Sequence, residues 1–208
     1  MKQTRRSLLA GFALINLLWL SACTLVPQAE PLTIYQLPAP DLTASAAKPL
    51  ALSLRIATPQ AGSVLSSPRM VVNPQGNELQ TYKGARWSDP VPALLREHLI
   101  RAFEQRAVLA AVSTDENTFR ADVHLSSDLR RFQVIYAGSR PVAVIELNAR
   151  LISPASRKII AGKTFTVEQP LPSTEIPGVV EGFKLASDEL AAELIDWTQR
   201  QLENFPRP

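Results

Sequence analysis

Few residues of this 208-residue chain could take part in covalent or acid–base chemistry. Cys23 is the only cysteine, and His98 and His124 are the only histidines. A thiol can accept a lipid, form a disulfide, bind a metal or act as a nucleophile, and an imidazole can act as a general base. The segment that surrounds each side chain decides which of these chemistries is available.

Cys23 stands at the end of an N-terminal apolar segment. Basic residues at positions 2, 5 and 6 precede an apolar run from Leu8 to Leu20, which is the order of a secretory signal. As a helix this run would extend only ~20 Å, short of the ~30 Å hydrocarbon core of a bilayer. The sequence Leu20-Ser21-Ala22-Cys23 is similar to a bacterial lipobox, which is cleaved before a cysteine that carries lipid. We therefore predict a lipoprotein signal peptide at residues 1–22, cleavage between Ala22 and Cys23, and lipid on Cys23.

Two alternatives to this interpretation stay open. The segment could be an ordinary secretory signal in which Cys23 is incidental, and Arg5-Arg6 also permits twin-arginine export. Thr24, where an aspartate would signal retention in the inner membrane, favours sorting to the outer membrane. We expect a lipid-anchored protein at the periplasmic face of that membrane.

The charge balance of the mature chain argues against a nucleic-acid partner. Residues 1–22 contain three basic and no acidic residues, so the 22 basic residues of the whole chain fall to 19, equal to its 19 acidic residues. The net charge of +3 therefore belongs to the signal. The length suits one globular domain, which we place at residues 49–205, and with Cys23 lipidated no thiol remains for a disulfide or a metal site.

The remaining candidates for catalysis have simpler explanations. His98 shares an apolar helical stripe with Leu94 and Leu95, which predicts a packed histidine, and His124 lies on the polar side of a strand. Glu189 and Glu193 lie one turn apart on a helix, where a solvated face explains them. The sequence contains no His-Glu-x-x-His, Gly-x-Ser-x-Gly or glycine-rich phosphate loop. We expect no enzymatic activity, metal or cofactor.

Residues 23–48 predict a tether between the membrane and the domain. Prolines at positions 27, 31, 38 and 40 and the small residues 43–47 are typical of a linker. Within it, residues 33–37 are β-prone and could form an edge strand, although prolines at both ends would limit its pairing.

Alternating apolar residues predict most of the strands. Leu50 to Ile56 alternates with period two, and residues 69–72 and 78–82 flank a turn with proline and glycine, which predicts a hairpin. Later alternating segments at 119–125, 132–136, 143–151 and 159–167 predict an antiparallel meander. Because the apolar parity changes between Leu125 and Phe132, we expect a bulge or kink at residues 126–131.

Two amphipathic helices complete the predicted domain. Asp89 is a suitable N-cap and Pro90 suits the first helical position, and an apolar stripe follows to Phe103, with Arg96 away from it. After a proline-rich loop at 169–178, a second stripe runs from about Gly178 to Glu203. We predict an α+β, two-layer sandwich: a mostly antiparallel or mixed sheet with both helices packed on one face.

Three residues near the hairpin could bind a partner. Arg69, Tyr82 and Trp87 are of the types that dominate protein interfaces. The same residues could instead brace the hairpin against the first helix, with Trp87 covering the first helical turn. The sequence leaves both interpretations open.

Several of these features together resemble the ABC-type transport auxiliary lipoproteins, which include the PqiC-like outer-membrane lipoproteins. The features are the lipobox, Tyr35-Gln36-Leu37, Arg69-Met70-Val71-Val72, Leu79 with Tyr82, Trp87 followed by a helix at Pro90, and the closing amphipathic helix. The resemblance covers nearly the whole mature chain. It implies a non-enzymatic adaptor for an MCE-type periplasmic protein and an ABC permease that move phospholipids between membranes, and it allows a homo-oligomer. A structural or assembly-factor envelope lipoprotein and a lipid-binding carrier are the alternatives.

Overall fold

The computed structural model describes residues 31–115, 120–136, 140–203 and 205. The chain divides into two units, Met1–Pro31 and Leu32–Pro208, and every element of secondary structure described lies in the second. The predicted signal peptide and lipidation site at Cys23 lie outside the described residues. Among the described helices, none is both long enough and apolar enough to cross a bilayer.

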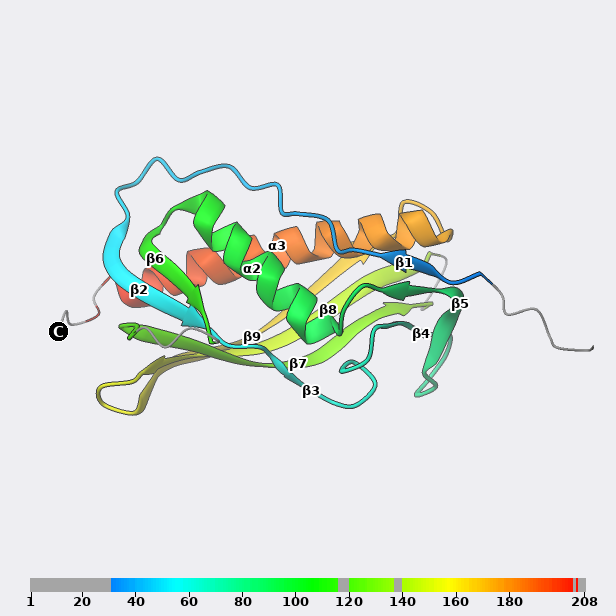
Figure 1. Cartoon of the computed structure of the whole chain (residues 1–208), viewed down its shortest axis with the longest axis horizontal. Helices are drawn as coiled ribbons and strands as arrows, with labels where there is room; N and C mark the ends of the chain where they lie inside the picture. The colour runs from blue at the N-terminus through cyan, green and yellow to red at the C-terminus, as the bar shows by residue number, and fades with distance from the viewer. Residues whose placement is uncertain (1–30, 116–119, 137–139, 204, 206–208) are drawn as a thin grey trace, which may run out of the picture. The chain divides into compact units, whose positions relative to one another are not determined.

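The second unit is a nine-stranded mixed sheet with two helices (Figure 1). In chain order the elements are β1 (Thr33–Tyr35), β2 (Leu50–Ile56), β3 (Gln60–Ala61), β4 (Arg69–Asn73), β5 (Gln80–Trp87), α2 (Val91–Arg106), β6 (Leu109–Thr114), β7 (Val123–Ile135), β8 (Val142–Ser153), β9 (Lys158–Pro170) and α3 (Ile176–Leu202). The fold is the predicted α+β two-layer arrangement.

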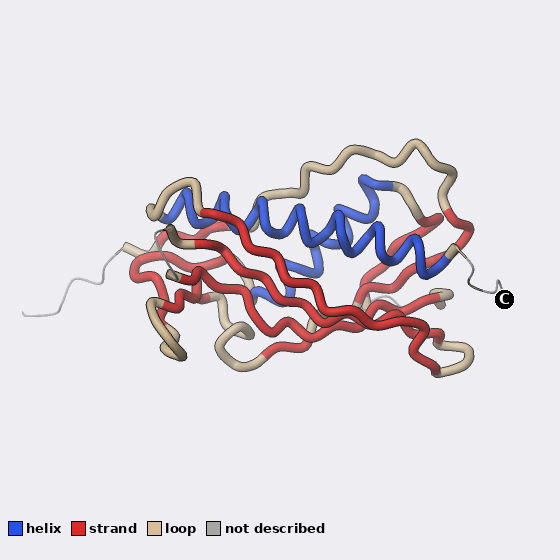
Figure 2. Tube along the Cα trace, turned by 180° about the vertical axis from the view of Figure 1, so that it is seen from behind, coloured by secondary structure: helices blue, strands red, loops and turns tan. Residues whose placement is uncertain are grey.

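Strand β7 organises the sheet. On one side β7, β8 and β9 form the predicted antiparallel meander, visible from behind in Figure 2. On its other side, β2, β3 and β4 pair with β7 in succession, each parallel to it. The sheet then continues in two arms, because β6 pairs with β2 while β5 and then β1 extend from β4. The long ladders are therefore antiparallel and the short ones mostly parallel.

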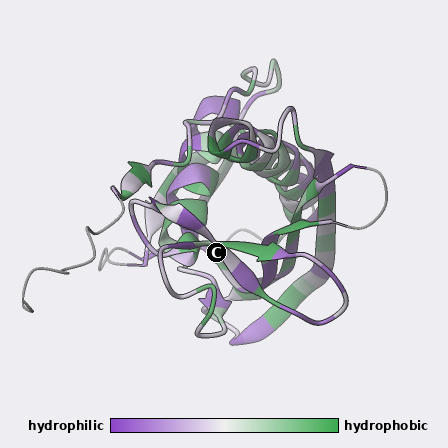
Figure 3. Cartoon of the chain, turned by 90° about the vertical axis from the view of Figure 1, so that its right-hand side faces the viewer, coloured by the Kyte–Doolittle hydropathy of each residue, from purple (hydrophilic) through white to green (hydrophobic). Residues whose placement is uncertain are grey.

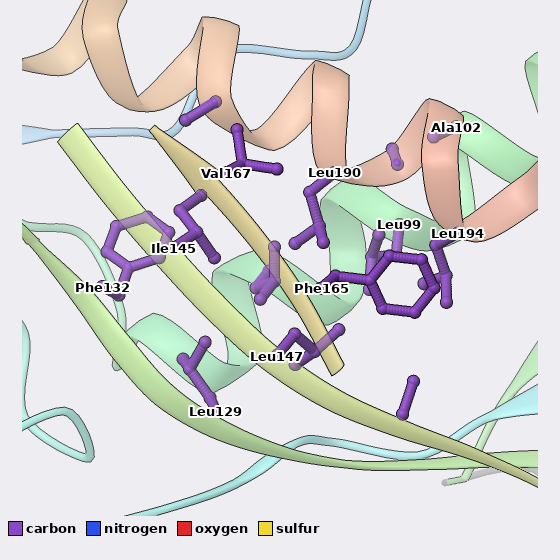
Figure 4. Close-up of a cluster of buried hydrophobic side chains, with 14 of the residues drawn as sticks. Leu99, Ala102, Leu129, Phe132, Ile145, Leu147, Phe165, Val167, Leu190 and Leu194 are labelled. Atoms are coloured by element: carbon purple, nitrogen blue, oxygen red, sulfur yellow. The ribbon is translucent and has the colours of Figure 1, made fainter. Parts of the chain in front are cut away.

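The core lies between the sheet and the two helices, which the end-on view in Figure 3 shows on the same side of the strongly curved sheet. The inward-facing strand residues and the apolar stripes of both helices meet there, as Figure 4 shows. The labelled side chains, all buried, are Leu99, Ala102, Leu129, Phe132, Ile145, Leu147, Phe165, Val167, Leu190 and Leu194. The predicted apolar faces of β2, β8 and both helices are thereby confirmed.

The predicted interruption of β7 is confirmed. The register between β7 and β8 shifts between Leu129 and Arg131, so Arg130 is an extra residue that changes which face the following side chains occupy. A second shift, between Leu151 and Ile152 of β8, was not predicted. It puts Ile159 of β9 opposite Ile152 and leaves its side chain 61% exposed, so the expectation that Ile159 faces the core is wrong.

Both helices begin one or two residues away from the predicted positions. The N-cap of α2 is Pro90, with Pro92 inside the first turn, so Asp89 is not the cap and makes no capping hydrogen bond. Helix α3 begins at Ile176, and β9 extends to Pro170, so the proline-rich loop is shorter than predicted. Arg96, predicted to point away from the core, is buried and donates hydrogen bonds to Asp115 and Thr58, both 2.9 Å long.

The structure corrects the prediction that residues up to 48 form a free tether. Residues 33–35 form the predicted edge strand, and residues 36–45, here called the strap, then run along α2 to reach β2 (Figure 1). Gln105 fixes the strap twice, because its side chain accepts from the Leu42 N–H (3.2 Å) and donates to the Pro40 carbonyl (3.0 Å). The Ser45 N–H donates to the Arg106 carbonyl at 3.0 Å. Sequence patterns missed this because the strap is anchored by contacts with residues about 60 positions away.

Candidate partner-binding surface

The β4–β5 hairpin carries the residues that were predicted to bind a partner. Its turn uses Gly76 in a left-handed conformation (φ +55°), and the Asn73 side chain donates to the Gly76 carbonyl at 2.9 Å. The pairing is irregular, since Arg69 lies opposite Arg86 but Val71 lies opposite Thr81. Gly84 has φ +66°, a conformation that glycine adopts without strain, and it lies within the extra β5 residues.

Trp87 belongs to the core and cannot contact a partner in this structure. Its side chain is 1% exposed and packs edge to face on Phe132 and Phe183, with centroid distances of 6.1 and 5.7 Å. Phe132 and Phe183 in turn stack on each other at 4.3 Å. The prediction that Trp87 binds a partner is therefore wrong. The alternative that Trp87 packs inside the domain is correct, but its ring partners lie on β7 and α3 and not on the first helix. The physical reason is that the odd positions at the end of β5 face α3.

Tyr82 is half-buried in the hairpin. Burial raises the pKa of its phenol above the ordinary value, and the neighbouring Tyr136 phenol raises it further. Tyr136 itself is 40% exposed. The two tyrosines thus form a partly accessible aromatic pair beside the turn, of the amphipathic kind that is enriched at interfaces.

Arg69 is exposed at the start of β4. It lies directly opposite Arg86 of β5, and Arg86 lies opposite Ile34 of β1. Sequence analysis missed Arg86 and Ile34 as surface candidates. The available signal was the alternation along β5, because Arg86 must face away from whichever side Trp87 occupies.

His98 and the paired glutamates make contacts within the domain. His98 is buried between α2, α3 and the strap, with Nε2 3.0 Å from an Asp188 carboxylate oxygen and Nδ1 3.2 Å from the Pro38 carbonyl. Burial lowers its pKa below the ordinary 6.5, and the Asp188 carboxylate only partly offsets this. Glu189 accepts a hydrogen bond from Gln169, and Glu193 lies 3.9 Å from Lys163, so both tie α3 to β9.

Comparison with known proteins identifies the family. The family model described as "ABC-type transport auxiliary lipoprotein component" matches residues 35–195, which run from the end of β1 almost to the end of α3. The chain belongs to this family. The family name describes lipoproteins, which are membrane-anchored proteins of the cell envelope, and assigns them an auxiliary part in ABC-type transport.

Individual relatives show similarity in sequence, in structure or in both. A protein named XCC0632 from Xanthomonas campestris has 38% identity and a TM-score of 0.75, over 81% of this chain and 95% of that one. A solved structure titled only as an uncharacterized protein has 15% identity and a TM-score of 0.65, over 81% and 99% of the chains, which supports the fold alone. The uncharacterized protein bll6063 from Bradyrhizobium diazoefficiens is 32% identical over 79% of this chain but only 44% of its own length.

Proposed function

We propose that this auxiliary lipoprotein is anchored by lipid on Cys23 at the periplasmic face of the outer membrane. There it acts as the docking partner of an MCE-type periplasmic protein in an intermembrane phospholipid transport system with an ABC permease. The observation that carries the proposal is the family match over residues 35–195, because it spans the whole two-layer domain and leaves no other domain among the described residues to supply a different activity.

The packing of the domain supports docking over catalysis or lipid carriage. Buried apolar side chains from the sheet and both helices form one hydrophobic core, which includes the stacked rings of Phe132 and Phe183. A lipid carrier, by contrast, needs a sizeable apolar cavity. Two surface pockets hold about 180 and 490 Å³, and polar side chains make up much of both linings. Across the described part of the chain, no group of three or more His, Cys, Asp or Glu residues could hold a metal.

The short connection to Cys23 also supports a docking role. Because the strap is bound to α2, only residues 24–31 separate Cys23 from the domain that begins at Leu32. A fully extended chain between Cys23 and Leu32 would span at most about 30 Å. An anchored domain with this reach needs a partner that comes to it across the periplasm.

We propose the β4–β5 hairpin as the contact surface. Tyr82 with Tyr136 supplies the aromatic part of that surface, and exposed Arg69 supplies a charge. Trp87 contributes only by holding the hairpin against α3.

Site-specific photocrosslinking in cells tests the docking proposal. A photoreactive residue at position 136 should crosslink to an MCE-type protein, and the same residue at exposed position 164 of β9 should not. Crosslinks from both positions to the same partner, or from neither, would contradict the proposed surface. Crosslinks from position 136 only to a second copy of the chain would show self-assembly in its place.

Labelling with palmitate tests the anchor separately. Label should enter the wild-type protein and be absent from Cys23→Ala, since that substitution removes the only thiol. Label in the variant would rule out Cys23 as the lipid attachment site. Fractionation of the labelled protein would then show whether it reaches the outer membrane.

A further inference from the structure

A row of three exposed side chains crosses the β1–β5–β4 arm. Ile34 pairs with Arg86, and Arg86 pairs with Arg69. Directly opposed residues of neighbouring strands project from the same face of a sheet. Because Ala85 and Trp87 point into the core, the row Ile34–Arg86–Arg69 projects from the opposite face, away from the helices.

The two arginines of this row are placed unfavourably for the protein alone. Like charges directly opposite each other in a sheet repel. Among the described residues, no acidic side chain forms an ion pair with Arg69 or Arg86. The arginines on the same face of β7 and β8 differ, since Arg131 pairs with Glu146 at 2.6 Å and Arg150 pairs with Asp128. The arginines of β7 and β8 therefore have acidic partners within the sheet. Arg69 and Arg86 are left able to bind an external anion.

Aliphatic side chains adjoin the two cations. Ile34 is 54% exposed, and Leu32, two residues earlier, is 53% exposed. Strand β1 is also the edge of this arm, and Leu32 is the point from which the chain leads back through residues 24–31 to Cys23. If Cys23 carries lipid, as proposed, Leu32 is held within about 30 Å and Ile34 within about 40 Å of the membrane surface.

We propose that the row Ile34–Arg86–Arg69, with Leu32, docks on the phospholipid headgroups of the membrane that holds the anchor. The two guanidinium groups bind lipid phosphates, which suit the planar donor geometry of arginine and remove the repulsion between them. Leu32 and Ile34 enter the interfacial region. This inference rests on the proposed function through the lipid anchor at Cys23. In it Arg69 contacts lipid in place of the protein partner, which leaves Tyr82 and Tyr136 as the protein-binding part of the hairpin, and the β1–β5–β4 arm takes a fixed orientation on the membrane.

Vesicle sedimentation with the mature chain carrying Cys23→Ser tests the proposal without the acyl anchor. The protein should bind vesicles of phosphatidylglycerol and phosphatidylethanolamine at low salt. Arg69→Gln with Arg86→Gln should weaken binding about 25-fold, from about fivefold per basic residue near an anionic surface. The matched control, Lys158→Gln with Arg200→Gln, removes the same charge from exposed positions on β9 and α3 and should change binding less than about twofold.

A second pair of variants tests the aliphatic part of the row. Leu32→Asn with Ile34→Asn should weaken binding at high salt as well, because screening removes the arginine contribution but not the apolar one. Absence of vesicle binding by the unsubstituted protein, or equal losses in the arginine pair and its control, would overturn the proposal. The proposal would also fail if the arginine pair kept vesicle binding but lost crosslinking to the MCE-type protein, a result that would leave the proposed function intact. Absence of palmitate label from the wild-type protein would contradict the proposed anchor, whereas vesicle binding by the Cys23→Ser protein tests the surface itself.

Discussion

Two adjacent residues of strand β5 face opposite sides of the sheet and have different surroundings. Trp87 faces α3 and is enclosed by Phe132 and Phe183, whereas Arg86 faces outward beside Arg69 and Ile34. Tryptophan and arginine are the two residue types most enriched in binding hot spots. In this protein only the arginine is available for binding. Residue type therefore does not show which of the two side chains is buried. The position along the strand does, because alternate residues face opposite sides of the sheet.

Truncating Trp87 is the strongest test of this separation. We expect Trp87→Ala to lower the free energy of unfolding by about 3–5 kcal/mol, because it leaves a cavity among fully buried rings. Trp87→Phe is the matched control and should cost much less, since no described residue accepts a hydrogen bond from the Trp87 indole. Urea unfolding measures both. An alanine variant as stable as wild type, but deficient in partner crosslinking, would restore Trp87 as a binding residue.

Core positions far from the hairpin sharpen the comparison. Leu54 of β2 and Leu194 of α3 are both fully buried, so Leu54→Ala and Leu194→Ala should each cost about 2–5 kcal/mol in urea unfolding. Neither variant should alter vesicle binding of the folded protein at low urea. Unchanged urea midpoints at both positions would mean that the assigned core face is incorrect.

Substitution of the buried His98 tests whether a polar group in the core makes the free energy of unfolding depend on pH. Burial keeps the folded-state pKa of His98 below 6.5, and Lys184 lowers it further, although Asp188 and the Pro38 carbonyl raise it. The unfolded chain therefore binds the proton first as pH falls. The free energy of unfolding should therefore decrease between about pH 7.5 and about pH 5.5. His98→Gln should reduce this dependence.

His124 provides the control for that experiment. Its pKa is also lowered, by burial and then by Arg55, but the residue is only half-buried. His124→Gln should therefore keep most of the wild-type pH dependence. Equal slopes for wild type and His98→Gln would contradict the assignment to His98.

The smallest expected effect concerns the row Ile34–Arg86–Arg69. Arg86→Gln removes one of two opposed like charges and should raise the free energy of unfolding by about 0.2–1 kcal/mol at low salt. Added salt should shrink this gain because it screens the repulsion in the wild type. Lys158→Gln is the comparison variant, and a larger gain there would show that general charge and not the Arg69–Arg86 pair is responsible.

Much of the architecture could be read from local patterns. The alternation in β2 and β8, the change of parity within β7 and the stripes of α2 and α3 each depend on neighbouring residues, and the structure confirms them. The lipobox at Cys23 is equally local, and its lipidation remains a prediction. These features could be predicted because a period of two in a strand, or of 3.6 in a helix, shows directly which side of the element is buried.

Contacts between distant residues were decided only by the tertiary structure. The strap has the composition of a linker, but Gln105, some 60 residues later, bonds to it. Arg96 has the helical position of an exposed residue, but it is buried and bonds to Asp115 at the domain surface. The direction in which Trp87 points, and the register that sets Arg86 between Ile34 and Arg69, likewise depend on strands far apart in the chain. The sequence period determines which residues lie on the same face of a strand or helix. The pairing of strands and the packing of helices determine which other residues that face contacts.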